Sequence, residues 1–431
     1  MTTPAPVTAD HIGGGSVAEG ALHDDAPAPK VLIPLLVLAA FGLYLASLTP
    51  PIITLAVRIA GIDPEGKTVA LSTVILIGAV VSIAALPLCG ALSDRSRSRF
   101  GRRRPWLVGG AVIGLIGLGI AGTVPSIPAV AIGYALASLG YAGAFAGFLP
   151  LIPEFVPDHL RARLSGLIGF VVAIAVLVGV VLGSQLVTLP ALMLGLPAIV
   201  ALIGALALAA AIKKVDRPMD IAWPRFGVRQ FLGSYWLRTN GDRDFAWNWV
   251  SRLLLGVAYV GIQTFAVFFL SDTAGLSTEA AAGEYARITA ISTPVSVVCF
   301  LVSGFLSDRL GRRKAFVVMG AILIAGALVI AAVTQSLTGF LVAWLILTVG
   351  QAIYLTVDIA IAAAVVPDDA QAGKAMSVFQ VATLLPNVLA PIAAVAVLTV
   401  SGGENYPVFF LVLAVLALLS AVAVMFVRRI R

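Results

Sequence analysis

The chain contains 431 residues, of which 60% are hydrophobic and 11% are charged, and its mean hydropathy is +1.04. Soluble domains are about half apolar and about a quarter charged, so this composition excludes a soluble globular protein and indicates an integral membrane protein. The net charge of +7 does not require a nucleic-acid partner, because its arginine-rich segments are flanked by apolar runs that belong in a membrane.

Residues 1–30 are rich in Ala, Pro, Gly and acidic side chains and show no periodic apolar pattern, which predicts a disordered N-terminus. No basic segment opens this region. The first apolar run, 31–57, is followed by further apolar runs and not by a small-residue cleavage site. We therefore expect it to be retained as a first membrane span and not removed as a signal peptide.

Apolar runs of about 20 residues, the length with which a helix crosses a bilayer, recur along the rest of the chain. The predicted fold class is therefore an all-α integral membrane protein with twelve transmembrane helices. The spans are expected near 31–57, 69–93, 106–124, 127–152, 164–189, 191–212, 246–270, 285–306, 315–335, 338–366, 376–400 and 405–427. Cys89 and Cys299 lie inside spans, where a thiol usually acts as a small packing residue, so we predict neither a disulfide nor a metal site.

Lys and Arg residues are concentrated in alternate connections, and short loops that keep their positive charge stay cytoplasmic. This asymmetry predicts a multi-pass protein of the cell membrane with both termini inside, leaving only Arg58, Lys67 and Arg287 outside. The long hydrophilic connection separates six spans from six. The expected divisions are a cytoplasmic N-terminus (1–30), an N-terminal half (31–212), a cytoplasmic linker (213–245), a C-terminal half (246–427) and a basic tail (428–431).

The two halves share a repeated segment between their second and third spans. GALSDRSRSRFGRRRPWLVGGA (90–111) recurs as GFLSDRLGRRKAFVVMGA (304–321), with four extra residues in the first copy. A weaker repeat aligns 151–166 with 361–376, at the junction of the fourth and fifth spans. Six-helix halves repeated in parallel are the organisation of one large class of transporters.

The paired motif G-x-L-S-D-R-(x)-G-R-R/K resembles the signature loop of the major facilitator superfamily, and the resemblance extends over 31–427. The expanded form SDRSRSRFGRRRPW, together with YLTVDIAIAAAVVPD (354–368), resembles the sucrose/proton and glycoside–cation symporters of that superfamily. The resemblance implies two pseudo-symmetric six-helix halves and transport by alternating access. It also implies that the first and fourth helices of each half line a central cavity.

Local chemistry suggests that the repeated loops gate the transporter. Asp94 and Asp308, at helix ends, can cap a neighbouring helix or pair with an arginine. Gly90 and Gly304 permit close approach of helix backbones. The alternative is that the arginines only fix topology and bind anionic lipid. We expect both roles in different residues, and assign the second to much of Arg97, Arg99 and Arg102 to Arg104. The candidate gating residues are Gly90, Asp94, Arg95, Gly101, Arg102, Glu154, Gly304, Asp308, Arg309, Gly311 and Arg312.

Polar and aromatic residues share one face in three of the four helices that the resemblance places at the cavity. The candidate cavity residues are Tyr134, Ser138 and Tyr141, with Phe145, in 127–152; Tyr259 and Gln263 in 246–270; and Gln351 and Tyr354 in 338–366. For each single residue the alternative is a hydrogen bond between helices with no role in binding substrate.

Asp358 lies on the same face as Gln351 and is the only acidic residue well inside a predicted span, since Glu154 lies at a helix end beside Pro153. A carboxylate at that depth is costly unless it is paired or protonated, so it suggests a function. Arg252, on a neighbouring cavity helix, is a candidate partner. We predict that Asp358 and Arg252 couple transport to protons; the alternatives are a permanent structural pair or an Arg252 that reaches the membrane surface.

The sequence therefore favours a secondary active transporter, with proton-coupled uptake of a sugar, glycoside or similar small polar solute as the first choice. Proton-driven efflux of a drug or metabolite is the alternative. No P-loop is present, and the three histidines, His11, His23 and His159, are scattered outside the spans, so ATP-driven transport and a histidine-based enzyme are disfavoured. The expected partners are the solute, H⁺ and membrane lipids, with no cofactor or nucleic acid, and the protein is expected to be a monomer.

Overall fold

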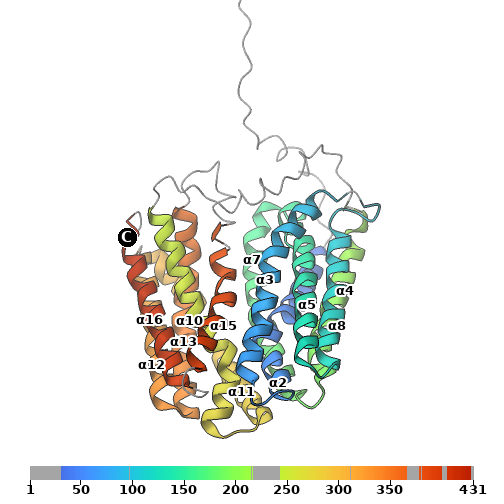
Figure 1. Cartoon of the computed structure of the whole chain (residues 1–431). Helices are drawn as coiled ribbons and strands as arrows, with labels where there is room; N and C mark the ends of the chain where they lie inside the picture. The colour runs from blue at the N-terminus through green and yellow to red at the C-terminus, as the bar shows by residue number, and fades with distance from the viewer. Residues whose placement is uncertain are drawn as a thin grey trace, which may run out of the picture.

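The described membrane-spanning segments of the structure, a computed structural model, are helical (Figure 1). The described residues are 31–96, 98–214, 216, 243–310, 312–365, 378–379, 381–399 and 405–428. Among them, 12 helical spans are long and apolar enough to cross a membrane, which confirms the predicted fold class. The N-terminus (1–30), most of the predicted linker and the end of the tail lie outside the described residues, so the predictions made for them stay predictions.

The N-terminal half contains six spans, the first of which is built from three consecutive helical segments. Its elements are α1 (Leu32–Thr49), a π-helical turn (η1, Pro50–Thr54), α2 (Leu55–Ala60), α3 (Lys67–Asp94), α4 (Arg104–Thr123), α5 (Ile127–Phe148), α6 (Leu151–Phe155), α7 (Asp158–Gln185), α8 (Pro190–Ala211) and a 3-10 turn (η2, Ile212–Lys214).

The C-terminal half contains the other six spans. Its elements are α10 (Arg243–Ala274), α11 (Thr278–Leu310), α12 (Arg313–Thr334), α13 (Leu337–Val365), α15 (Pro386–Leu398) and α16 (Tyr406–Met425). The span that contains α15 also includes residues 381–384.

The same helix pair packs closely in both halves. A Cβ atom on Gly110 of α4 would overlap the backbone of Ala144 in α5. In the second half, a Cβ atom on Gly320 of α12 would lie 2.7 Å from the carbonyl oxygen of Gly350 in α13. Small residues allow this approach, and van der Waals packing at such contacts holds membrane helices together. The repeat in sequence is thus matched by a repeat in packing.

Two pairs of helices join the halves: α3 packs against α15, and α7 packs against α11. Figure 1 shows these helices between the two bundles. We call the end of the molecule that carries residues 98–104, 312–314 and 428 the arginine-rich end, and the end that carries 61–66 and 275–277 the opposite end. At the opposite end, α10 also contacts η1 and α2.

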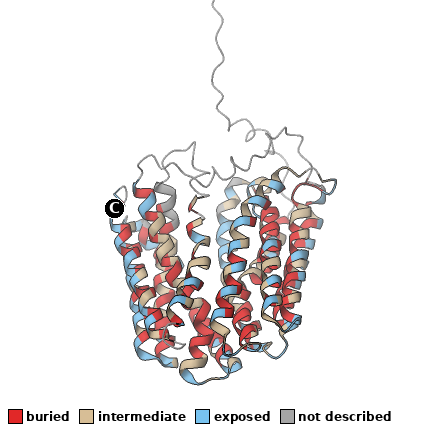
Figure 2. Cartoon of the chain, viewed as in Figure 1, coloured by how far each residue is buried: buried red, intermediate tan, exposed pale blue. Residues whose placement is uncertain are grey.

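Buried residues lie inside each bundle and exposed apolar residues lie on its outer faces (Figure 2). Leu301, Phe305 and Val333 are 69–74% exposed, which suits side chains that face lipid. The halves are therefore held by their interior packing and present an apolar perimeter.

The first span changes its winding at Pro50 and Pro51. A proline has no backbone N–H and its ring disturbs the preceding turn, and here the backbone widens into the π-helical turn before the α-helix resumes at Leu55. The N–H of Leu55 donates to the carbonyl of Pro50. Such turns often accompany functional sites, and this one borders the cavity described below.

Several helices extend beyond the spans that hydropathy predicts. The helix expected from 285 begins at Thr278, and the one expected from 246 begins at Arg243. Charged side chains end an apolar pattern without ending a helix: the extension of α11 contains Glu284, which pairs with Arg287 one turn later at 2.7 Å. Such pairs stabilise helix ends that project out of the membrane.

Candidate functional site: a cavity between the two halves

A cavity of about 220 Å³ lies where the N-terminal half meets the span that contains α15. Its walls come from the first span (46–51), α3 (75–86), α5 (134–145) and residues 384 and 387, with one leucine of α4. Because both halves contribute, relative movement of the halves changes the shape of this cavity.

The cavity has a mostly apolar lining with a few uncharged polar side chains. Its polar lining residues are Ser47, Ser82, Tyr134, Ser138, Tyr141 and Asn387, and none of the described lining residues is ionisable as an acid or a base near neutral pH. Hydroxyl and amide groups both donate and accept hydrogen bonds, and tyrosine rings add flat apolar surface. This set can bind an uncharged polar molecule.

The three residues singled out on 127–152 all line this cavity, and so does Phe145, whose ring centroid lies 5.0 Å from that of Tyr44. Tyr141 is the most informative of them. Its side chain packs against Gly114, where a Cβ atom would lie 2.7 Å from the ring, and its buried hydroxyl has no hydrogen-bond partner among the described residues. Buried hydroxyls normally have a partner, and none of the described residues supplies one here.

The polar residues singled out in the C-terminal half separate into two groups. The Tyr259 hydroxyl accepts a hydrogen bond from the Gln263 amide at 3.4 Å and also bonds to Gln351, so these three lie together. Tyr354 is 1% exposed and lies 3.2 Å from the Ser251 hydroxyl, which in turn lies 2.9 Å from that of Ser420. Tyr354 therefore joins α10, α13 and α16, which is the interhelical alternative.

Arg252 and Asp358 form an ion pair inside the C-terminal half. Asp358 is completely buried, and its second carboxylate oxygen, Oδ1, has no hydrogen-bond partner among the described residues. The Arg252 guanidinium lies 4.4 Å from the Phe379 ring centroid, and its Nε donates to the Thr383 hydroxyl at 3.0 Å. Phe379 and Thr383, which the sequence did not single out, thus lie beside the pair.

The ion pair and the cavity share one segment of chain. Thr383 contacts Arg252, and the next residue, Leu384, lines the cavity, as does Asn387. A change at the ion pair that moves this segment therefore changes the cavity wall. This is a physical connection between the charged pair and the polar lining.

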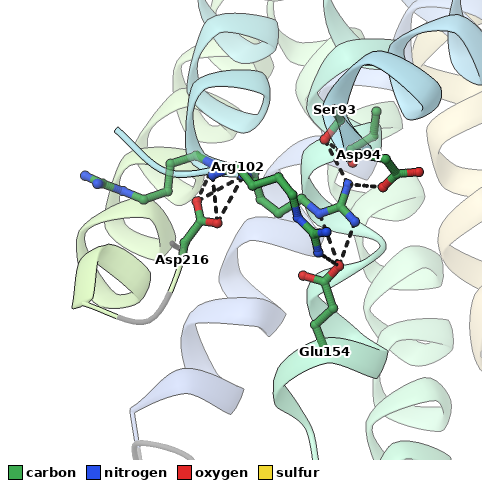
Figure 3. A network of polar contacts seen from close by, with 8 residues as sticks. Ser93, Asp94, Arg102, Glu154 and Asp216 are labelled. Atoms are coloured by element: carbon green, nitrogen blue, oxygen red, sulfur yellow. Dashed lines mark hydrogen bonds and ion pairs between the residues drawn. The ribbon is translucent and has the colours of Figure 1, made fainter. Parts of the chain in front are cut away.

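At the arginine-rich end, four charged side chains and one serine of the N-terminal half form a second charged network (Figure 3). Arg103 contacts Asp94 at 2.7 Å and Glu154 at 2.6 Å, and it donates to the Ser93 hydroxyl at 3.0 Å. Arg102 binds the same Glu154 oxygen at 2.5 Å. Burial would lower the pKa of Arg103, but its hydrogen bonds and charge interactions with Glu154 and Asp94 raise that pKa above the usual value.

The network corrects the assignment of this loop. Arg102 and Arg103 are 8% and 3% exposed, so they are buried structural cations and do not serve only topology. Arg103, Ser93 and Asp216 are the residues that sequence reasoning missed. Burial of an arginine next to several others gives no signal in a single sequence.

Asp216, just after η2, holds the start of α4. Its carboxylate accepts hydrogen bonds from the backbone N–H groups of Arg102, Arg103 and Arg104 at 2.9–3.2 Å. These are the unpaired donors of a helix N-terminus, where a negative charge is favourable. Gly101 has φ +103, and a Cβ atom there would overlap the Asp216 carboxylate.

The described residues of the second copy of the loop repeat one feature of this arrangement. Arg104 Nε donates to the Ala209 carbonyl at 2.7 Å, and its counterpart Lys314 donates to the Met425 and Val427 carbonyls at 2.5 and 3.0 Å. Each cation thus holds the end of the last helix of its half.

The remaining loop predictions have mixed outcomes. Nothing lies within 4 Å of a Cβ placed on Gly90, so the close approach expected there is absent among the described residues, whereas a Cβ on Gly304 would lie 3.3 Å from Thr356. Arg95 follows the last residue of α3, Arg309 lies in the last turn of α11, and Arg312 is exposed before α12. The side chain of Asp308 and residue Gly311 lie outside the described residues.

Solved structures resemble this fold over most of its length. They include a bacterial homologue of the human lysosomal transporter Spinster in an inward-facing and occupied conformation (TM-score 0.70, 16% identity, 94% of this chain and 98% of that one). A peptide transporter in complex with sulfate (0.69, 14%, 92% and 94%) and the nucleoside transporter NupG (0.67, 16%, 91% and 99%) are similar.

One curated relative, an uncharacterized symporter of Synechocystis sp., is 45% identical over 51 residues, which is 12% of this chain and 9% of that protein's length. The sequence model of the Major Facilitator Superfamily matches residues 32–298 and 283–431, and so covers nearly the whole chain. With twelve spans among its described residues, two repeated halves and a cavity between them, the chain belongs to the Major Facilitator Superfamily and is a secondary transporter.

Proposed function

We propose that the protein takes up a small uncharged polar solute, such as a sugar or glycoside, together with a proton. The observation that carries this proposal is the cavity between the halves, whose described polar lining consists of hydroxyls and one amide. A sugar presents hydroxyl groups and apolar ring faces, which these side chains and the tyrosine rings complement. An anionic or cationic solute would enter without a compensating charge on the described lining, at a high cost in desolvation.

The buried Arg252–Asp358 pair supports a proton as the coupling ion. Protonation of Asp358 would neutralise it and release Arg252 from the pair, and Arg252 touches the segment that forms the cavity wall. Solute binding and protonation would then favour the same arrangement of that segment, which is the linkage that a symporter requires. The short match to a symporter agrees with this direction of coupling.

The network around Arg103 is proposed to stabilise one position of the N-terminal half. It joins the end of α3 to α6 by contacts of 2.7 and 2.6 Å, and such contacts can form in one conformation and break in another. We place the arginine-rich end in the cytoplasm, with both termini, in the cell membrane, because Lys and Arg favour that side. The protein acts as a monomer surrounded by lipid.

Counterflow in proteoliposomes tests the proposal. Vesicles loaded with an unlabelled solute should accumulate the labelled form of the same solute, and a panel of neutral sugars and glycosides should compete with it. Peptides, organic anions and cationic drugs of similar size serve as the charged comparison set. Competition by the charged set alone would contradict the assigned substrate class. Transport in which protons move inward only while solute moves outward would contradict the assigned direction.

A further inference from the structure

A second buried ion pair joins the two halves at the opposite end of the molecule. Lys67, the first residue of α3, pairs through Nζ with Oδ1 of Asp272 in the last turn of α10. The other oxygen, Asp272 Oδ2, accepts a hydrogen bond of 2.8 Å from the hydroxyl of Tyr406, the first residue of α16. One carboxylate therefore receives a cation from the N-terminal half and a hydroxyl from the C-terminal half.

The surroundings of this pair are apolar and aromatic. The side chains of Lys67 and Asp272 are only 12% and 11% exposed. Lys67 Nζ lies 5.3 Å from the centroid of the Phe268 ring, and the rings of Tyr406 and Phe269 are 5.5 Å apart. A charge in such a place is stable only while its partner is present, so the halves either hold the pair together or must expose both charges to water.

The position of the pair distinguishes it from the other ion pairs of the molecule described above. Arg103 with Glu154 and Arg252 with Asp358 each connect helices of one half. Lys67 with Asp272 connects α3 to α10, and α10 also contacts η1 and α2 at this same end. Separation of the halves at the opposite end therefore has to break this pair.

We propose that Lys67, Asp272 and Tyr406 form a latch that keeps the opposite end closed, and that the latch opens each time the cavity is exposed to that side. None of the three lines the cavity, so they are positioning residues that set which side the cavity faces. The proposal requires only that the halves move against each other. It does not depend on the solute or coupling ion assigned above.

The test measures access to the cavity from each face of the membrane. Ala79, a cavity-lining residue of α3, is replaced by cysteine in a background without Cys89 and Cys299, and a membrane-impermeant thiol reagent is added to right-side-out or inside-out vesicles. Asp272→Asn and Lys67→Met should each raise the labelling rate about tenfold from the membrane face at the opposite end of the molecule. They should lower it from the face at the arginine-rich end, because loss of the latch shifts the conformational equilibrium. Tyr406→Phe, which removes only the hydroxyl, should shift it in the same direction by less.

Two comparisons separate the latch from a general effect on stability. Glu284→Gln removes an ion pair at the same end but within α11, and it should leave both labelling rates unchanged. The exchanged pair Lys67→Asp with Asp272→Lys should return the rates toward those of the parent. If Asp272→Asn and Tyr406→Phe both fold and label at the parental rates from both faces, the latch proposal is overturned, whatever solute the protein carries.

Discussion

Arg103 and Glu154 contact each other at 2.6 Å, and the same Glu154 oxygen accepts a bond from Arg102 at 2.5 Å. Two buried cations thus share one carboxylate, which is 26% exposed, whereas Asp94, among the described residues, pairs with Arg103 and is 45% exposed. In a partly buried network, the charge that is less exposed to water and has more partners contributes more to stability. The loop and α6 are therefore held mainly through Glu154.

Asp94→Asn should slow solute exchange while leaving equilibrium binding nearly unchanged, because Asp94 touches the loop and not the cavity. Glu154→Gln should slow exchange more, since it removes the carboxylate that Arg102 and Arg103 share and leaves the Arg103 side chain with Asp94 as its acidic partner among the described residues. Counterflow rates and binding affinities of both variants, measured on the same preparations, decide this. A loss of binding in Asp94→Asn with a normal exchange rate per bound transporter would contradict the gating role.

Gly101→Ala should lower the thermal unfolding midpoint of the protein in detergent. The residue has φ +103 and faces the Asp216 carboxylate, so alanine adds backbone strain of about 1–2 kcal/mol and also displaces the acceptor of three backbone N–H groups. Gly109→Ala is the matched control, because it lies within α4 with nothing within 4 Å of the added Cβ. An equal midpoint for the two variants would show that Asp216 does not hold this loop.

The sequence is sufficient for the twelve spans, the two halves and the repeat, because hydropathy and spacing report directly on membrane helices. It also brings Tyr134, Ser138 and Tyr141 to one face, since helical spacing is a local property. The sequence does not predict which of two identical side chains lines the cavity and which joins helices, because three-dimensional packing decides this. Tyr354 differs from Tyr141 only in its neighbours, Ser251 and Ser420, which are far away in the chain.

The same limit applies to charged residues. Arg103 stands between two other arginines, and only its burial distinguishes it. Lys67 follows a loop at the opposite end and its partner Asp272 lies 205 residues later, so no spacing rule connects them. Pairing between halves is a property of how the halves dock, which local sequence patterns do not encode.

Tyr141→Phe should weaken solute binding about threefold to tenfold, the loss expected for one hydrogen bond, without lowering protein stability. Its hydroxyl is buried in the cavity wall and has no partner among the described residues. Tyr354→Phe should lower protein stability without weakening solute binding, because its hydroxyl contacts Ser251 within the C-terminal half. Binding affinity and unfolding temperature of the two variants form the test, and a stable Tyr141→Phe protein with unchanged affinity would remove Tyr141 from the binding site.

The proposed topology predicts that the connection between the halves and the C-terminal tail are cytoplasmic. Cysteines placed at Arg225 and Ile430, both outside the described residues, in a variant without Cys89 and Cys299 should resist impermeant thiol reagents in intact cells and react after permeabilisation. A cysteine at Asp63, in the loop between α2 and α3, is the control and should react in intact cells. Labelling of position 225 or 430 without permeabilisation would contradict the orientation.

Asp358→Asn should abolish accumulation driven by a pH difference while preserving counterflow at equal pH, because asparagine imitates the neutral acid permanently and cannot release a proton. The change also leaves Arg252 buried without its anion, which destabilises a protein by about 3–5 kcal/mol when such a pair is broken. The double variant Arg252→Gln with Asp358→Asn removes both charges and should recover most of that stability. It should still fail to concentrate solute, since the proton carrier is absent. If either folded variant concentrates solute against a gradient when only a pH difference is imposed, Asp358 is structural, and the coupling proton has to be sought at Glu154 or replaced by another ion.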